Sequence, residues 1–133
     1  MSEFLFVYGT LHRGQPLHPY LAGSRTLFVG EGVIPGRLFD LGDYPAAIAD
    51  SKRFSTIRGE VHELLAPDEI LPVLDEVEGF DPQRPGKSLF ERVEATVVLE
   101  DGRTLRAWVY FYRRSLLGAT EIPNGDYIRY RSE

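Results

Sequence analysis

The chain begins with an apolar stretch that ends at a glycine, and this junction could bind an anion. Residues 4–8 are apolar or aromatic at odd and even positions alike, which is typical of a strand buried on both faces. Gly9 then frees the backbone to turn and to expose N–H groups, and such groups bind negatively charged oxygen. The segment Tyr8-Gly9-Thr10-Leu11 is therefore a candidate binding loop. An ordinary turn at the end of a central strand is the alternative interpretation.

A carboxylate that could move protons stands at the end of the clearest helical segment, Pro67–Glu78. The apolar positions of this segment form one arc of a helical wheel, and Glu78 falls inside the arc between Leu74 and Leu71. Burial disfavours the charged form of an acid. We therefore expect Glu78 to have a raised pKa and to act as a proton shuttle near neutral pH.

The helix 67–78 carries two further acids near Glu78, and Glu78 itself could be arranged in other ways. Asp75 and Glu76 fall outside the apolar arc and are expected on the solvent side of the helix. For Glu78 itself two other arrangements stay open, because a residue at a helix end can fray outward or can pair with an arginine such as Arg92. Either arrangement would remove the reason for a raised pKa.

Other residues of catalytic interest lack the context that their chemistry needs. The three histidines, His12, His18 and His62, show no metal-ligand spacing and are expected to be surface or structural residues. No serine lies in a nucleophile-elbow sequence. The chain has no cysteine, which excludes a thiolate nucleophile, a disulfide and a sulfur-based metal site.

Composition narrows the class of protein and of partner. A chain of 133 residues with 43% hydrophobic residues predicts one globular domain covering residues 1–133. A net charge of −5 disfavours nucleic acid and anionic membrane as partners and favours a small molecule. No apolar run is long enough to span a membrane, and the first residues do not resemble a signal peptide, so we expect a cytoplasmic protein.

Turn-forming residues are frequent, with 13 glycines and 9 prolines, as expected of short strands joined by tight loops. The last two expected strands are joined by a hairpin turn that contains Asp101-Gly102. The final strand places Tyr110 on the same face as Trp108 and Tyr112, where a buried hydroxyl needs a hydrogen-bond partner. After the first strand, further strands are expected at residues 26–34, 36–41, 46–49, 57–65, 92–99 and 104–112.

Only one long segment is clearly helical. Pro67 suits the first position of the helix 67–78, and Gly79 ends it. Pro72 removes a backbone donor from the interior and is expected to split the segment into a turn and a second short helix. A further short helical turn is expected at 17–21. Many strands with one embedded helix predict an α+β domain whose sheet curls into a barrel.

Three segments taken together resemble the gamma-glutamylcyclotransferase-like family. They are Val7-Tyr8-Gly9-Thr10-Leu11, Phe39-Asp40-Leu41-Gly42-Asp43-Tyr44-Pro45 and Leu74-Asp75-Glu76-Val77-Glu78-Gly79-Phe80. Their order and spacing match over most of the chain. Gly14-Gln15-Pro16 and Gly59-Glu60-Val61 are similar to segments of the branch that contains gamma-glutamylamine cyclotransferases.

The resemblance implies a small mixed β-barrel with a few short helices packed on it. It also implies a cavity in which Glu78 is the catalytic acid and base. The implied substrate-binding residues are Tyr8, Gly9, Thr10, Leu11 and, as a weaker match, Tyr110. Relatives often have a tyrosine where this chain has Phe90, so a hydroxyl contact is lost there. The resemblance implies neither a metal nor a cofactor.

The implied reaction releases 5-oxoproline from a gamma-glutamyl amine or peptide by intramolecular attack of the α-amine. The leading alternative is a non-catalytic domain that binds a small anionic metabolite in the same cavity. A structural or partner-binding module is a third possibility, and it would have no deep pocket. The leaving amine and the oligomeric state stay open.

Overall fold

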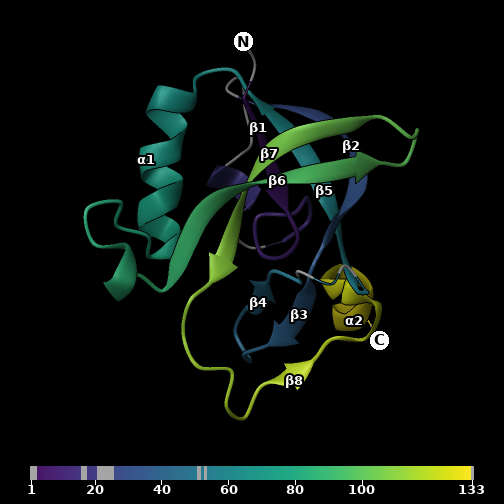
Figure 1. Cartoon of the computed structure of the whole chain (residues 1–133). Coiled ribbons are helices and arrows are strands. Elements are labelled where there is room, and N and C mark those ends of the chain that lie inside the picture. Colours follow the sequence, from purple (N-terminus) through teal and green to yellow (C-terminus); the bar gives the residue numbers. More distant parts are fainter. Residues whose placement is uncertain (1–2, 16–17, 21–25, 51, 53, 133) are drawn as a thin grey trace.

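A computed structural model describes residues 3–15, 18–20, 26–50, 52 and 54–132. Its centre is a closed five-stranded barrel in the order β1-β5-β2-β6-β7 (Figure 1). Neighbouring barrel strands are antiparallel except β1 and β7, which close the barrel in parallel through Leu5 and Trp108. The barrel strands are β1 (Glu3–Val7), β2 (Thr26–Pro35), β5 (Thr56–Leu64), β6 (Phe90–Leu99) and β7 (Thr104–Tyr112).

Strand β1 is buried on both faces, as its sequence predicts. Phe6 points into the barrel interior together with Val61 of β5 and Val109 of β7. Leu5 and Val7 belong to a second apolar cluster that lies between the barrel and the helix α1. Both parities of the strand are thus used, because one face fills the barrel and the other is covered by a helix.

Helix α1 (Pro67–Glu78) packs its apolar face on the outside of the barrel (Figure 1). Its bounds match the expected segment, and Gly79 adopts a left-handed conformation with φ of 71° at the C-cap. The expected split at Pro72 is wrong, because the helix continues through it. Pro72 is the sixth residue of the helix, and its missing N–H is close enough to the N-terminus to affect a single early hydrogen bond.

A three-stranded sheet in the order β4-β3-β8 lies below the barrel in Figure 1. Its strands are β3 (Arg37–Asp40), β4 (Pro45–Ile48) and β8 (Thr120–Glu121). Leu38, Ala47 and Ile122 extend the interior core of the barrel into this sheet. The sheet therefore shares one core with the barrel.

The C-terminal helix α2 (Tyr127–Ser132) has no counterpart among the expected elements. It has only six residues, too few for a periodic pattern to be recognised, and it is held by the burial of Tyr127 in the barrel core. Short 3₁₀ turns lie at His18–Tyr20, Pro85–Lys87 and Pro123–Gly125. The first falls within the expected turn at 17–21, whose end residues 17 and 21 lie outside the described part of the chain.

The fold is thus the expected α+β class with a small mixed barrel, and the expected strands are present with ends that move by up to two residues. The hairpin between β6 and β7 turns at Gly102, whose φ is 91°. Within the described ranges, none of the helices has the length and apolar character needed to cross a membrane.

Candidate active site

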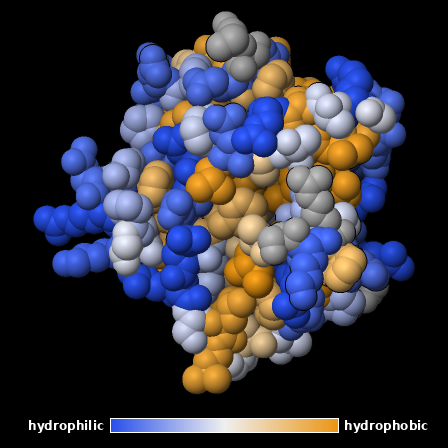
Figure 2. All heavy atoms as spheres, viewed as in Figure 1, coloured by the Kyte–Doolittle hydropathy of each residue, from blue (hydrophilic) through white to orange (hydrophobic). Residues whose placement is uncertain are grey.

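A cavity of about 260 Å³ opens where the loop after β1 meets the end of α1. Most of the side chains around it are apolar. On the face of the molecule drawn in Figure 2, apolar residues extend from the middle to the lower edge, with polar residues on both sides. The volume suits a small molecule. The lining residues used below are Tyr8, Gly9, Thr10, Leu11, Asp43, Tyr44, Pro45, Glu78, Phe90 and Tyr110.

Glu78 contributes a carboxyl group to the cavity wall. Loss of hydration in this mostly apolar setting raises its pKa from 4.5 to about 7. Among the described residues its carboxylate has no hydrogen-bond or ion-pair partner, so nothing there offsets the loss of hydration. The pairing with Arg92 considered from the sequence does not occur, because Arg92 binds another acid.

That other acid is Asp75, and its expected position on the solvent side of the helix is wrong. Asp75 is buried, with 6% of its surface exposed, rather than lying on the solvent side. Arg92 donates from Nε to Oδ1 over 2.8 Å and from Nη2 to Oδ2 over 3.2 Å, and the Tyr110 hydroxyl donates to Oδ1 over 2.7 Å. The buried face of α1 is therefore rotated away from Val73, which is 45% exposed, towards Asp75.

Tyr110 lines the cavity, and its hydroxyl donates to Asp75. The hydroxyl thus has the partner that its burial requires. The backbone carbonyl of Tyr110 accepts a hydrogen bond of 2.6 Å from the Tyr8 hydroxyl. Burial, with the charge of Glu78 as a smaller cause, holds the pKa of the Tyr8 hydroxyl well above its usual value, so this group stays neutral.

The loop after β1 keeps unbonded N–H groups beside the cavity. Within the described part of the chain, no hydrogen bond uses the N–H of Gly9, Thr10 or Leu11, whereas the N–H of His12 donates to the Gly9 carbonyl over 2.9 Å. Gly9 is not among the glycines with a positive φ, so the backbone freedom expected of it is not what requires a glycine here. Its role is close packing, because a Cβ atom there would collide with the ring of Pro45.

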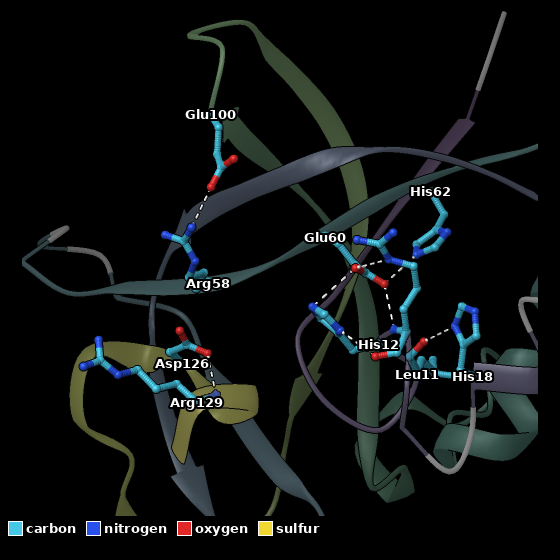
Figure 3. A network of polar contacts seen from close by, with 10 residues as sticks. Leu11, His12, His18, Arg58, Glu60, His62, Glu100, Asp126 and Arg129 are labelled. Carbon is cyan, nitrogen blue, oxygen red and sulfur yellow. Dashed lines mark hydrogen bonds and ion pairs between the residues drawn. The ribbon is translucent and has the colours of Figure 1, made fainter. Parts of the chain in front are cut away.

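A second buried acid, Glu60 on β5, was not singled out as a functional residue from the sequence. Its side chain is 0% exposed and lies among Arg13, His12 and His62, the last two of which are labelled with it in Figure 3. Burial alone raises its pKa, but hydrogen bonds from His62 and Arg13, with a smaller contribution from His12, outweigh burial and lower the pKa to about 2. Glu60 is therefore ionised at neutral pH.

The histidines make contacts that hold the structure together. His62 bonds Glu60, and His18 Nδ1 donates to the Leu11 carbonyl over 3.0 Å. No group of three or more potential metal ligands lies close together in the described ranges. A signal for the Glu60 cluster did exist in the sequence, since Glu60 and His62 alternate with apolar Val61 on a predicted strand. Only the fold shows that the loop after β1 covers them.

Residues 5–129 match the family described as "Gamma-glutamyl cyclotransferase, AIG2-like". A relative from Niallia circulans, named a gamma-L-glutamyl-butirosin B gamma-glutamyl cyclotransferase, is 35% identical over 96% of this chain and 76% of its own length.

Two solved structures are also similar. YkqA from Bacillus subtilis has a TM-score of 0.73 and 27% identity over 98% of this chain, which spans 41% of that protein. An AIG2-like protein from Mus musculus has a TM-score of 0.72 and 25% identity over 95% of this chain and 88% of its own. The cavity, with the Glu78 carboxyl group and the loop amides described above, thus lies in a chain that belongs to the gamma-glutamyl cyclotransferase, AIG2-like family.

Proposed function

We propose that this protein releases 5-oxoproline from a gamma-glutamyl amine or peptide, with Glu78 as general acid and base. Membership of the family supports a cyclotransferase activity. The observation that carries the assignment of Glu78 is its unpaired carboxyl group in the cavity wall, with a pKa raised to about 7. A group with such a pKa exchanges protons readily in both directions near neutral pH.

The reaction needs little from the protein because both reacting groups belong to one molecule. The α-nitrogen of the gamma-glutamyl group attacks its own γ-carbonyl carbon, which forms the lactam bond, and the bond from that carbon to the departing nitrogen then breaks. Holding the chain in a folded geometry gives the attack the advantage of an intramolecular reaction. The reaction needs no nucleophilic side chain of the protein, and it consumes no water.

Glu78 would carry the protons in this scheme. The α-ammonium loses two protons as it becomes the lactam N–H, and the departing nitrogen gains two as it leaves as an ammonium ion. Glu78 takes a proton from the α-ammonium to free the attacking lone pair and later delivers a proton to the leaving nitrogen. The raised pKa suits both steps, because the ionised and protonated forms are both populated near pH 7.

The loop amides of Gly9, Thr10 and Leu11 would hold the negatively charged oxygens of the substrate. Their availability supports this role, since no hydrogen bond between described residues uses them. The ring of Tyr110 would form the wall of the same subsite, and the Tyr8 hydroxyl is already engaged with the Tyr110 carbonyl. Phe90 also lines the cavity and contributes no hydroxyl.

A screen of gamma-glutamyl amines and gamma-glutamyl dipeptides for released 5-oxoproline tests the proposal. We expect at least one class to be turned over, and Glu78→Gln to abolish most of that turnover while the far-ultraviolet circular dichroism spectrum stays unchanged. Normal turnover by a folded Glu78→Gln protein would reject the mechanism. Binding of 5-oxoproline without turnover of any substrate would instead favour a non-catalytic domain that binds small anionic metabolites.

A further inference from the structure

The Glu60 cluster lies outside the cavity and has no part in the proton transfers above. Ile57 and Val61 of β5 point into the barrel interior. Successive side chains of a strand point to opposite faces, so Glu60 and His62, on either side of Val61 in the sequence, face outward. An outward-facing acid is normally solvated. Glu60 is fully buried, and two of its partners belong to the loop that follows β1.

Glu60 binds both the backbone and the side chain of that loop. The backbone N–H of Arg13 donates to Oε1 over 2.8 Å, and Arg13 Nε donates to Oε2 over 2.9 Å. From β5 itself, His62 Nε2 donates to Oε1 over 3.0 Å, while His12 Nε2 lies 3.4 Å from Oε2. Charge-assisted bonds of this kind are stronger than neutral ones and fix direction as well as distance.

The loop is also fixed at neighbouring points. The Arg13 guanidinium lies 3.7 Å from the ring centroid of Phe28 on β2, so its side chain is held between two barrel strands. The carbonyl of Leu11 accepts a bond from His18, and the carbonyl of Gly9 accepts one from the N–H of His12. Carbonyls of the loop are thus occupied, while the N–H groups of Gly9, Thr10 and Leu11 have no hydrogen-bond partner among the residues that the structure describes.

We infer that Glu60 and Arg13 are positioning residues that hold the loop after β1 so that its free N–H groups bind the carboxylate of the substrate. This inference rests on the proposed function. It adds that the recognition of the substrate depends on an ion pair on the outside of the barrel. The pair acts on binding of the ground state, and Glu78 acts on the proton transfers.

The test compares substrate binding with turnover in Glu60→Gln. A neutral amide keeps the shape but removes the negative charge and one of the two oxygens that accept from Arg13. We expect KM for a verified gamma-glutamyl substrate and Kd for 5-oxoproline to rise by about tenfold, with kcat within a factor of about three of the unchanged protein. Amide hydrogen exchange at residues 10–13 should become faster, while exchange in α1 stays the same.

Two variants at Arg13 keep the test decisive if Glu60→Gln fails to fold. The Arg13 side chain is 51% exposed, so Arg13→Gln should leave the fold intact and raise KM in the same way. Arg13→Lys retains a cation next to Glu60 and should restore most of the affinity. The control is Glu100→Gln, which removes an exposed carboxylate paired with Arg58 on the same barrel and should change neither KM nor loop exchange.

An unchanged KM together with unchanged exchange at residues 10–13 in folded Glu60→Gln and Arg13→Gln would overturn the inference. A fall in kcat with KM unaltered would overturn it as well, because the loop would then act on the transition state. Failure of the proposed function looks different: the unmodified protein would turn over no gamma-glutamyl compound, and loop exchange would still report whether the ion pair holds the loop.

Discussion

Glu60 and Glu78 are two glutamates in partly apolar surroundings whose pKa values move in opposite directions. The pKa of Glu60 falls to about 2 and that of Glu78 rises to about 7, from the same ordinary value of 4.5. Burial raises both. Glu60 has an arginine and two histidines around it, whereas Glu78 has no ionic or hydrogen-bond partner among the described residues. The partners decide the direction of the shift.

The two acids are associated with different parts of the loop after β1, and their contrast indicates different roles. Glu60 stays ionised and holds the far end of the loop through Arg13, while Glu78 faces the cavity that the near end of the loop lines. A paired carboxylate is suited to holding structure because its charge does not change. An unpaired one is suited to proton transfer because its charge changes easily.

The largest expected effect is on the rate after Glu78→Gln. Glutamine keeps the size of the side chain but cannot exchange a proton. Turnover should fall by about 10²-fold to 10⁴-fold, the usual share of general acid and base catalysis. In the unmodified protein kcat/KM should decrease as the pH falls through about 7, because the ionised base is then lost. Assays of 5-oxoproline release between pH 5 and 9 measure the loss of turnover in Glu78→Gln and the pH dependence of kcat/KM in the unmodified protein.

A control at Glu76 sharpens this prediction. Glu76 is exposed on the same helix, so Glu76→Gln should leave the rate and its pH dependence as they are. Asp75 is not a suitable control, since it is buried and paired. Equal losses of rate in Glu78→Gln and Glu76→Gln would remove the distinction between the two acids.

The next largest effect concerns Asp75, the paired acid that precedes Glu78 by three residues on α1. Arg92→Met leaves Asp75 buried with the Tyr110 hydroxyl as its one remaining side-chain partner in the described part of the chain. It also removes a guanidinium lying 4.4 Å from the centroid of the Trp108 ring. Breaking a buried pair in this way should lower the free energy of unfolding by about 3–5 kcal/mol. Urea denaturation measures the loss.

The matched comparison is Arg58→Met, which breaks an exposed pair with Glu100. It should cost less than about 1 kcal/mol, because water solvates both charges. A similar small loss in Arg92→Met would show that the buried pair next to the cavity behaves like a surface pair, and the contrast between paired and unpaired buried acids would fail.

Stability should depend on pH with opposite sign at the two glutamates. The lowered pKa of Glu60 stabilises the native protein above pH 4.5, and that contribution is lost as the pH falls from 4.5 towards 2. The raised pKa of Glu78 stabilises the native protein below pH 4.5, and that contribution is lost as the pH rises from 4.5 to about 7. Each contribution amounts to roughly 3 kcal/mol.

Glu60→Gln should therefore lower the free energy of unfolding at pH 7, whereas Glu78→Gln should raise it at pH 8. Urea titrations from pH 3 to 9 on both variants test the signs. A loss of stability at pH 8 in Glu78→Gln would mean that its carboxylate has a stabilising partner after all.

The smallest expected effect is that of Thr10→Val in the loop between the two acids. This change keeps the shape and the backbone N–H but removes a hydroxyl. Turnover should fall by less than about tenfold, with the pH profile of kcat/KM unmoved. A shift of that profile would mean that Thr10 influences the pKa of Glu78, and steady-state kinetics over pH would reveal it.

Local patterns in the sequence predicted much of this structure. The barrel strands, the hairpin at Gly102 and both ends of α1 follow from side-chain periodicity and turn chemistry, which depend on neighbours along the chain. Helical periodicity also placed Glu78 on the buried face. The helix α2 was missed because it is short and depends on a tertiary contact of Tyr127.

Partners across the fold could not be predicted in this way. The wheel counted only apolar residues and so placed Asp75 in solvent, because nothing near it in the sequence signals that Arg92 and Tyr110 would approach. Gly9 was assigned a conformational role, whereas its requirement is set by Pro45 from another sheet.

The sequence by itself therefore determined the family, most of the elements and the place of Glu78 on the face of α1 that lines the cavity. Only the tertiary structure decided which buried acid is paired and which is not, because an ion pair depends on distance in space and Glu60 meets Arg13 across 47 positions of the chain. The pKa of each carboxyl group follows from those partners. That is why the roles of Glu60 and Asp75 appeared only in the fold.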